Sequence, residues 1–217
     1  MRTRLSTGTV AEAHQVPSAP IGLVVHPDMF GLRPLFDEHV RRFAEDWGMS
    51  TVAIDPFPNL ADGAGPDERF ATMPTKRDSD VFDDLRAAAE LTGCSTVRMI
   101  GFCMGGMYAF KAAASGIFDR IVSVYGMIAL PEPWRGPDQS EPLSLLAAGD
   151  AASVLAILGG RDIWTPADDI EKLRETAVTI AYYPEGEHGF AHDPSRPAHR
   201  PDDAISAFVA ARNWLTR

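Results

Sequence analysis

The segment Thr96-Val-Arg-Met-Ile-Gly-Phe-Cys-Met-Gly-Gly106 decides the fold that we expect for this chain. Its apolar first half predicts a buried strand over residues 96–100, and its glycine-rich second half predicts a tight turn that leads into a helix. A sharp strand-to-helix turn holds its central residue in a strained conformation and exposes that side chain above the edge of the sheet. The central residue here is Cys103.

The residues around Cys103 fit such a turn. The positions two before and two after it approach closely, so only small residues such as Gly101 and Gly105 fit there. The turn places Cys103 at the amino end of a helix, where partial positive charge stabilises a thiolate. The N–H of Met104 is then free to bind a developing oxyanion. The alternatives are a small buried hydrophobe and a phosphate-binding loop, but the chain lacks the middle glycine and the Lys-Ser/Thr pair of phosphate loops.

Short apolar runs alternate with amphipathic stretches on both sides of this turn, which favours a mainly parallel sheet covered by helices. We expect strands at residues 21–26, 50–55, 96–100, 120–124, 154–158 and 179–183. We expect helices with apolar stripes at Phe36, Val40, Phe43 and Trp47, ending at Gly48; at Val81, Phe82, Leu85, Ala88 and Ala89, ending at Gly93; and at Met107, Phe110 and Ala114, ending near Gly116.

Two more helices are expected in the last third of the chain. Thr165-Pro166 suits a helix N-cap followed by proline at the first helical position. Asp202-Asp203 opens the last helix, with Ile205, Phe208 and Val209 facing inward. Residues 59–79 and 131–150 lack periodicity and are expected to be long loops that serve as lids or binding segments. No domain boundary is visible, so we expect one doubly wound α/β domain over residues 1–217, with ligands at the carboxyl ends of its strands.

Composition narrows the class of partner. The 217 residues include 20 Lys+Arg and 30 Asp+Glu, a formal net charge of −10. This balance argues against nucleic acid and anionic membrane surfaces, which attract clustered basic residues. No apolar run is long enough to span a membrane, and the start lacks a signal-peptide pattern, so we expect a cytoplasmic protein. In that compartment Cys94 and Cys103 are expected to be free thiols. The sequence carries no signal for an oligomeric state.

An acid and a base follow later strands. Asp162 ends the segment Leu158-Gly-Gly-Arg-Asp162, and His188 lies in the glycine-rich segment Glu185-Gly-Glu-His-Gly-Phe190. A thiol nucleophile benefits from a base and from a group that orients the base. The chain order Cys103, Asp162, His188 is the nucleophile–acid–base order of the α/β-hydrolases. Each residue on its own also fits a surface or capping role, but the ordered set is far more specific.

The chain resembles the dienelactone hydrolase family of α/β-hydrolases. Four segments carry the resemblance: Asp28-Met-Phe-Gly31, Gly101-Phe-Cys-Met-Gly-Gly106, Gly160-Arg-Asp162 with Pro166, and Gly186-Glu-His-Gly-Phe190. The cysteine is the specific feature, because most α/β-hydrolases have serine at this turn. The resemblance implies the α/β-hydrolase fold, a mainly parallel central sheet with helices on both faces. It also implies hydrolysis of a small ester or lactone through an acyl-thiol intermediate.

The same resemblance implies roles for particular residues. Cys103 would be the nucleophile, His188 the general base and then acid, and Asp162 the residue that orients His188. Met29 and Met104 would supply backbone N–H groups to the oxyanion hole. No metal or organic cofactor is implied, and the expected partner is a small-molecule substrate.

The chain departs from the family at some site positions. Asp28 stands where the family typically has a glutamate that contacts the resting cysteine. His192 stands where an arginine for the substrate carboxylate is expected, and Arg69 or Arg77 is a candidate for a second such arginine. Phe30 and Tyr125 are candidates to line the acyl pocket or, alternatively, to pack in the core.

Other interpretations remain open at this point. His188, His192 and Asp193 invite a metal site, but four prolines between residues 184 and 201 argue against a helix that would place both histidines on one face. A thioesterase or another acyl hydrolase could use the same three residues. A non-catalytic module that binds a small acyl ligand is the alternative outside the enzymes.

Overall fold

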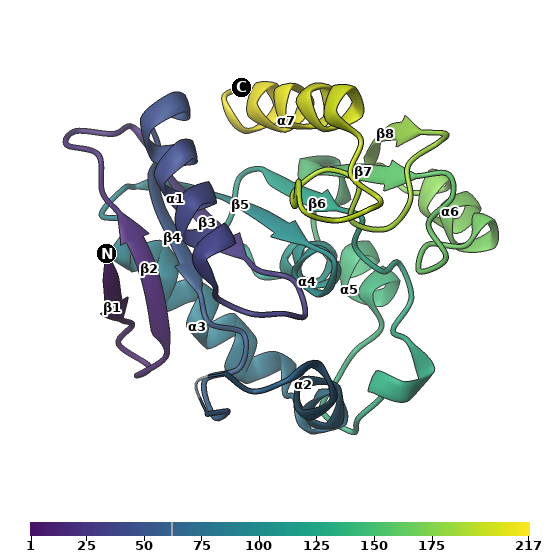
Figure 1. Ribbon diagram of the computed structural model, residues 1–217, viewed down its shortest axis with the longest axis horizontal. Helices are drawn as coiled ribbons and strands as arrows, with labels where there is room; N and C mark the ends of the chain where they lie inside the picture. Colours follow the sequence, from purple (N-terminus) through teal and green to yellow (C-terminus); the bar gives the residue numbers. More distant parts are fainter. Residues whose placement is uncertain (62) are drawn as a thin grey trace.

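The computed structural model describes residues 1–61 and 63–217, within which eight strands form one sheet (Figure 1). The strands are β1 (Arg2–Arg4), β2 (Val10–His14), β3 (Ile21–His26), β4 (Ser50–Ile54), β5 (Thr96–Phe102), β6 (Ile121–Val124), β7 (Val154–Gly159) and β8 (Thr179–Tyr183). Their order across the sheet is β1-β2-β4-β3-β5-β6-β7-β8. The strands from β3 to β8 pair in parallel, which confirms the mainly parallel sheet.

The antiparallel edge of the sheet was not predicted. β1 pairs with β2, and β2 pairs with β4, both antiparallel. β1 has only three residues, and β2 consists of Val-Ala-Glu-Ala-His, which contains a single β-branched residue. Neither segment has the apolar pattern by which the other strands were found.

Helices cover both faces of this sheet. They are α1 (Pro34–Trp47), α2 (Pro66–Thr72), α3 (Asp78–Leu91), α4 (Met104–Ala112), α5 (Pro142–Ala148), α6 (Ala167–Arg174) and α7 (Pro201–Leu215), with short 3₁₀ turns η1 (Met73–Thr75), η2 (Glu132–Trp134) and η3 (Ala151–Ser153). Figure 1 shows α1 and α7 on one side of the sheet and α3 and α4 on the other. In the described part of the chain, no helix is long and apolar enough to cross a bilayer.

The two faces have separate cores. In β3, Leu23 and Val25 point into the cluster that contains α1 and α7, whereas Val24 points into the cluster that contains α3 and α4. This alternation is the two-residue period of a strand that is buried on both sides. It fixes the register of β3, at whose carboxyl end the loop bearing Asp28 begins.

Several expected boundaries differ from the structure. Residues 59–79 were expected to be a long loop, but within the described residues they contain α2, η1 and the start of α3; Asp62 lies outside the described residues. Residues 131–150 were expected to be another, but they contain η2 and α5. Both α2 and α5 have only seven residues, and α2 buries none of them, so no apolar stripe marks it in the sequence. The turn at residues 101–106 is also tighter than expected, because β5 continues to Phe102 and α4 begins at Met104.

Of the three residues expected to face inward on α7, Phe208 packs against the core, but Ile205 and Val209 do not. Ile205 and Val209 are 66% and 53% exposed, and the helix instead buries Ala204, Ala207, Ala211, Trp214 and Leu215. Alanines let the helix lie close to the sheet, and their small side chains gave a weak apolar signal. The start of α6 also differs by one position, since Pro166 itself is the N-cap residue.

Candidate active site

Cys103 lies at the strained turn between β5 and α4. Its backbone has φ 55° and ψ −114°, in a region that residues other than glycine rarely adopt. This is the strained conformation that the sequence predicted for Cys103. A Cβ atom on Gly101 would lie 2.0 Å from the carbonyl oxygen of Gly105, and one on Gly105 would lie 2.1 Å from the carbonyl oxygen of His26. Glycine is therefore required at both positions for this turn to close. The Cys103 side chain is half-buried, so its sulfur is not sealed in the core.

Asp162 and His188 meet beside this turn. Asp162 follows β7, is 5% exposed, and accepts a hydrogen bond of 2.8 Å at Oδ1 from the N–H of Trp164. Its Oδ2 lies 2.8 Å from Nδ1 of His188, which follows β8. Because Nδ1 faces the carboxylate, Nε2 is the ring nitrogen left for the thiol. The structure therefore pairs two of the three residues that the chain order singled out, Asp162 and His188.

The charges of this group favour a protonated imidazole. Burial opposes the charge on His188, but the negative charge of Cys103 and the hydrogen bond to Asp162 outweigh it and raise the pKa of His188 to about 10. Within the described residues, no hydrogen bond of regular geometry joins Cys103 to His188. The two side chains are nevertheless close enough for Cys103 to raise the pKa of His188. Contacts of this kind often tighten only when substrate binds.

Met29 and Met104 lie on two segments that pack together at the nucleophile. Met104 is the first residue of α4, and the first N–H groups of a helix have no acceptor within the helix. Met29 lies in a turn in which the N–H of Gly31 donates to the carbonyl oxygen of Asp28. Among the described residues, neither the N–H of Met29 nor that of Met104 donates a recorded hydrogen bond. Their role in an oxyanion hole stays a prediction.

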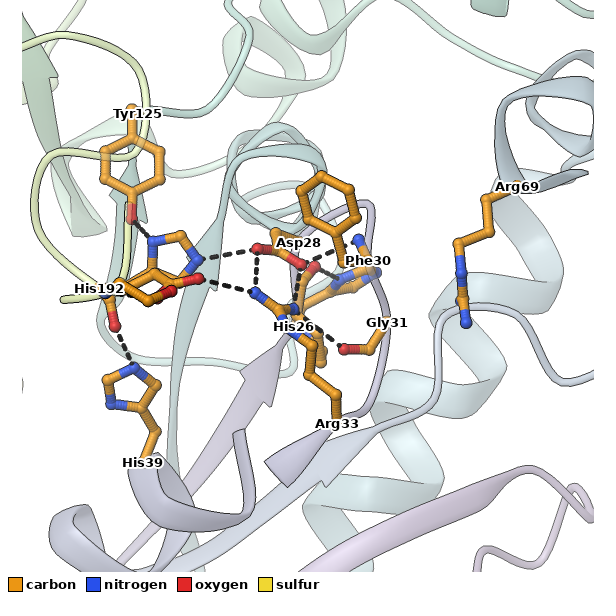
Figure 2. A network of polar contacts seen from close by, with 12 residues as sticks. His26, Asp28, Phe30, Gly31, Arg33, His39, Arg69, Tyr125 and His192 are labelled. Carbon is orange, nitrogen blue, oxygen red and sulfur yellow. Dashed lines mark hydrogen bonds and ion pairs between the residues drawn. The ribbon is translucent and has the colours of Figure 1, made fainter. Parts of the chain in front are cut away.

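Asp28 and His192 belong to a buried polar network (Figure 2). Asp28 accepts from Arg33 at 2.6 and 3.0 Å, from Nε2 of His192 at 2.8 Å and from the N–H of Phe30 at 2.9 Å. The hydroxyl of Tyr125 bonds to Nδ1 of His192. Among the described residues, Asp28 makes these hydrogen bonds and none to Cys103. His192 is 1% exposed with both ring nitrogens bonded, so its side chain is not open to a substrate.

The remaining predicted site residues are distributed differently. Phe30 is 40% exposed, whereas Tyr125 is fully buried beside His188, with their ring centroids 5.3 Å apart. In Figure 2 no dashed line joins Arg69 to the Asp28 network, although its guanidinium lies against Gly31. Arg69 donates to the carbonyl oxygen of Ala64 and lies over the ring of Phe57. Arg77 faces Asp138 at 3.9 Å.

Sequence reasoning missed three residues near the site. Trp164 is 40% exposed and stacks on Trp134, and its ring centroid lies 6.3 Å from that of His188. Its position two residues after Asp162 could have indicated that it lies near the site. Arg33 forms an ion pair with Asp28, and no sequence motif around either residue predicts this pair. Arg196 packs its guanidinium against Gly189 and lies 6.0 Å from the ring of Phe30, with no ion pair recorded within the described chain.

The metal interpretation fits the structure poorly. His188 and His192 each bond to a different aspartate, in a segment that is not helical. Across residues 1–61 and 63–217, no group of three or more His, Cys, Asp or Glu side chains is arranged to hold a metal ion.

Comparison with known proteins shows the family of this chain. The sequence matches the Dienelactone hydrolase family over residues 7–217. The chain belongs to the dienelactone hydrolase family. It is 27% identical over 196 residues to a carboxymethylenebutenolidase from Pseudomonas putida, an alignment that covers 82% of this chain and 77% of the relative. Members of this family hydrolyse ester or lactone bonds, and this chain is accordingly a hydrolase of that type.

Solved structures show which fold this member of the family has. A Klebsiella pneumoniae protein provisionally described as a dienelactone hydrolase has a TM-score of 0.85 at 21% identity, with 100% of this chain and 98% of that chain covered. An acylaminoacyl peptidase from Pyrococcus horikoshii has a TM-score of 0.71 at 16% identity, with 100% of this chain and 41% of that chain covered. At these identities the likeness concerns the fold, and it confirms the α/β-hydrolase fold that the resemblance implied.

Proposed function

We propose that this protein hydrolyses small esters or lactones with Cys103 as the nucleophile, through an acyl-thiol intermediate. The observation that carries the proposal is the 2.8 Å bond between Asp162 and His188 beside a cysteine held at a strained strand-to-helix turn. The names of the relatives favour an oxygen ester or a lactone over a thioester as the substrate class.

The first half of the reaction forms the acyl-thiol. The Cys103 thiolate attacks the carbonyl carbon, a C–S bond forms, and the carbonyl electrons move onto the oxygen. The N–H groups of Met29 and Met104 bind that oxyanion. The C–O bond to the leaving group then breaks, and protonated His188 gives its Nε2 proton to the departing oxygen. In a lactone this oxygen stays attached to the acyl chain.

The second half releases the acid. His188, now neutral, takes a proton from a water molecule as that water attacks the thioester carbon. The C–S bond breaks, the carboxylic acid leaves, and the thiolate returns beside the protonated imidazole. Asp162 holds Nδ1 throughout, so that Nε2 always faces the reacting atoms.

The test compares hydrolysis of p-nitrophenyl acetate by the wild type, Cys103→Ala and Cys94→Ala. Cys94 is the matched control because its thiol donates to the carbonyl oxygen of Ala19 at 3.3 Å, away from the site. We expect Cys103→Ala to lose at least about 10³-fold in kcat/KM, with Cys94→Ala unchanged. A Cys103→Ala variant with the wild-type rate would contradict the proposal. A wild type that retains an acyl ligand without turnover would favour a binding module.

A further inference from the structure

The structure contains a second His–Asp pair close to the first. His188 and His192 are four residues apart, and each bonds to an aspartate at 2.8 Å, His188 to Asp162 and His192 to Asp28. The two pairs use opposite ring nitrogens. His188 meets its aspartate through Nδ1, whereas His192 meets its aspartate through Nε2 and leaves Nδ1 for the hydroxyl of Tyr125. The catalytic scheme above uses only the first pair.

The hydrogen-bond partners of Asp28 and His192 indicate which of their atoms carry protons. Asp28 accepts four hydrogen bonds, and although burial opposes its charge, those from His192 and Arg33 lower its pKa to about 2. Asp28 is therefore a carboxylate, and His192 donates to it from Nε2. Burial lowers the pKa of His192, so its ring is neutral and Nδ1 is an acceptor. The hydroxyl of Tyr125 must then donate to Nδ1. Along the chain Tyr125–His192–Asp28, Tyr125 therefore donates to His192, and His192 donates to Asp28.

This chain connects two parts of the site, the turn that contains Met29 and the ring of His188. At one end, Asp28 bonds to the N–H of Phe30 and so closes the turn that presents the N–H of Met29. At the other end, the ring of Tyr125 meets that of His188 edge to face, with centroids 5.3 Å apart. His192 joins the two ends, and Figure 2 shows it between Tyr125 and Asp28. Its backbone oxygen is fixed in turn by Nε2 of His39 at 2.8 Å.

Tyr125 is also held in an unfavourable backbone conformation. Its φ is 38°, in the left-handed region that favours glycine, and its side chain is fully buried. Strained residues that neighbours hold in place cluster at functional sites. Tyr125 directly follows β6, next to the sheet edge where Cys103 lies, and its N–H donates to the carbonyl oxygen of Ile157 at 2.7 Å.

We propose that Tyr125, His192 and Asp28 form a positioning network that holds the His188 ring and the Met29 turn in the geometry that the reaction needs. The proposal rests on the proposed function and extends it to three residues that do not touch the reacting atoms. The ring of Tyr125 contacts the ring of His188, and the hydroxyl of Tyr125 holds the Tyr125 ring in place. His192 and Asp28 act through Tyr125 and through the turn.

The test is Tyr125→Phe, which keeps the ring and removes only the hydroxyl. Tyr183→Phe is the matched control, because Tyr183 also packs on Phe190 while its hydroxyl pairs with Ser206 outside the network. We expect Tyr125→Phe to lower kcat for p-nitrophenyl acetate by roughly tenfold to hundredfold, with KM changed less than about twofold. Tyr183→Phe should keep the wild-type kcat.

A second readout does not depend on turnover. We expect the NMR titration of His188 in Tyr125→Phe to shift from about 10 toward its ordinary value, because a displaced ring loses contact with Cys103 and Asp162. Alkylation of Cys103 by iodoacetamide near pH 7 should slow in the same variant. If the wild type hydrolysed no ester, the proposed function would fail while these two measurements would still decide the network.

Substitutions of His192 separate positioning from packing. His192→Gln keeps one donor and one acceptor, whereas His192→Phe keeps ring volume and loses both hydrogen bonds. We expect His192→Gln to retain more of the wild-type kcat than His192→Phe. The proposal is overturned if Tyr125→Phe matches Tyr183→Phe in kcat, in His188 titration and in Cys103 alkylation, and equally if His192→Phe is as active as His192→Gln.

Discussion

At the scale of single residues, the site depends on backbone and charge acting at the same atoms. The φ of 55° at Cys103 turns its side chain out at the end of β5, and the close approach of Gly101 and Gly105 makes that turn possible. His188 then lies between two anionic partners, Cys103 and Asp162, which is why its protonated form is favoured despite burial.

This charge arrangement predicts how His188 titrates. Cys103→Ala removes the charge that contributes most to raising the pKa of His188, so we expect that pKa to fall from about 10 toward 6.5. The measurement is an NMR pH titration of the His188 ring protons. Cys94→Ala serves as the control and should leave the titration unchanged. An unchanged titration in Cys103→Ala would show that the thiol does not interact with the ring.

Asp28 predicts a pH-dependent contribution to stability. Its folded pKa of about 2 lies below the ordinary 3.8, so its contribution is present above pH 3.8 and is lost as the pH falls toward 2. The difference corresponds to about 2 kcal/mol at neutral pH. We expect Asp28→Asn to be less stable than the wild type by at least about this amount near pH 7 in urea unfolding, with the gap narrowing as the pH falls. A gap that does not change with pH would contradict this account.

At the scale of the elements, the sequence predicted what periodicity and turn chemistry control. The six parallel strands, α1 with its end at Gly48, and the turn at Cys103 were all predicted close to their observed places. The Asp162–His188 pairing was accessible because both residues follow strands in a known order. The Tyr125–His192–Asp28 chain was not accessible, because its members lie up to 164 residues apart and meet only after folding. On α7, Phe208 was placed correctly, but Ile205 and Val209 were predicted wrongly because these large exposed side chains outweighed small buried alanines.

The corrected face of α7 gives a direct stability prediction. Ala207→Asp would place a charge at a position that is 2% exposed, against the sheet, and should cost several kcal/mol. Ile205→Asp, on the same helix at 66% exposure, should change stability by less than about 0.5 kcal/mol. Thermal or urea unfolding of the two variants measures the difference. Equal destabilisation by both variants would contradict this account, because it would indicate that Ile205 is buried.

At the scale of the whole molecule, the net charge is negative, but two arginines lie near the site. The chain carries a net charge of −10, yet Arg33 and Arg196 lie around Phe30 near the site. Arg33 is compensated by Asp28, whereas Arg196 has no recorded ion pair in the part of the chain that the structure describes. A half-buried guanidinium next to the loop of His188 is suited to bind a substrate carboxylate.

Arg196 therefore predicts selectivity between anionic and neutral substrates. We expect Arg196→Gln to raise KM for an ester that carries a carboxylate by about tenfold, the effect of losing one charged hydrogen bond. Neutral p-nitrophenyl acetate should be hydrolysed as before. Arg86→Gln, an exposed position on α3, controls for the change in net charge. The prediction fails if Arg196→Gln raises KM equally for both substrates, or if Arg86→Gln has the same effect.

The most direct test of the account is to find the acyl group during turnover. The protein is mixed with p-nitrophenyl acetate, quenched rapidly in acid, and analysed by intact mass and peptide mapping. We predict one acetyl group, on the peptide that contains Cys103, in the wild type and none in Cys103→Ala. An acetyl group on any other residue, or turnover at the wild-type rate in Cys103→Ala, would contradict the claim that this cysteine is the nucleophile.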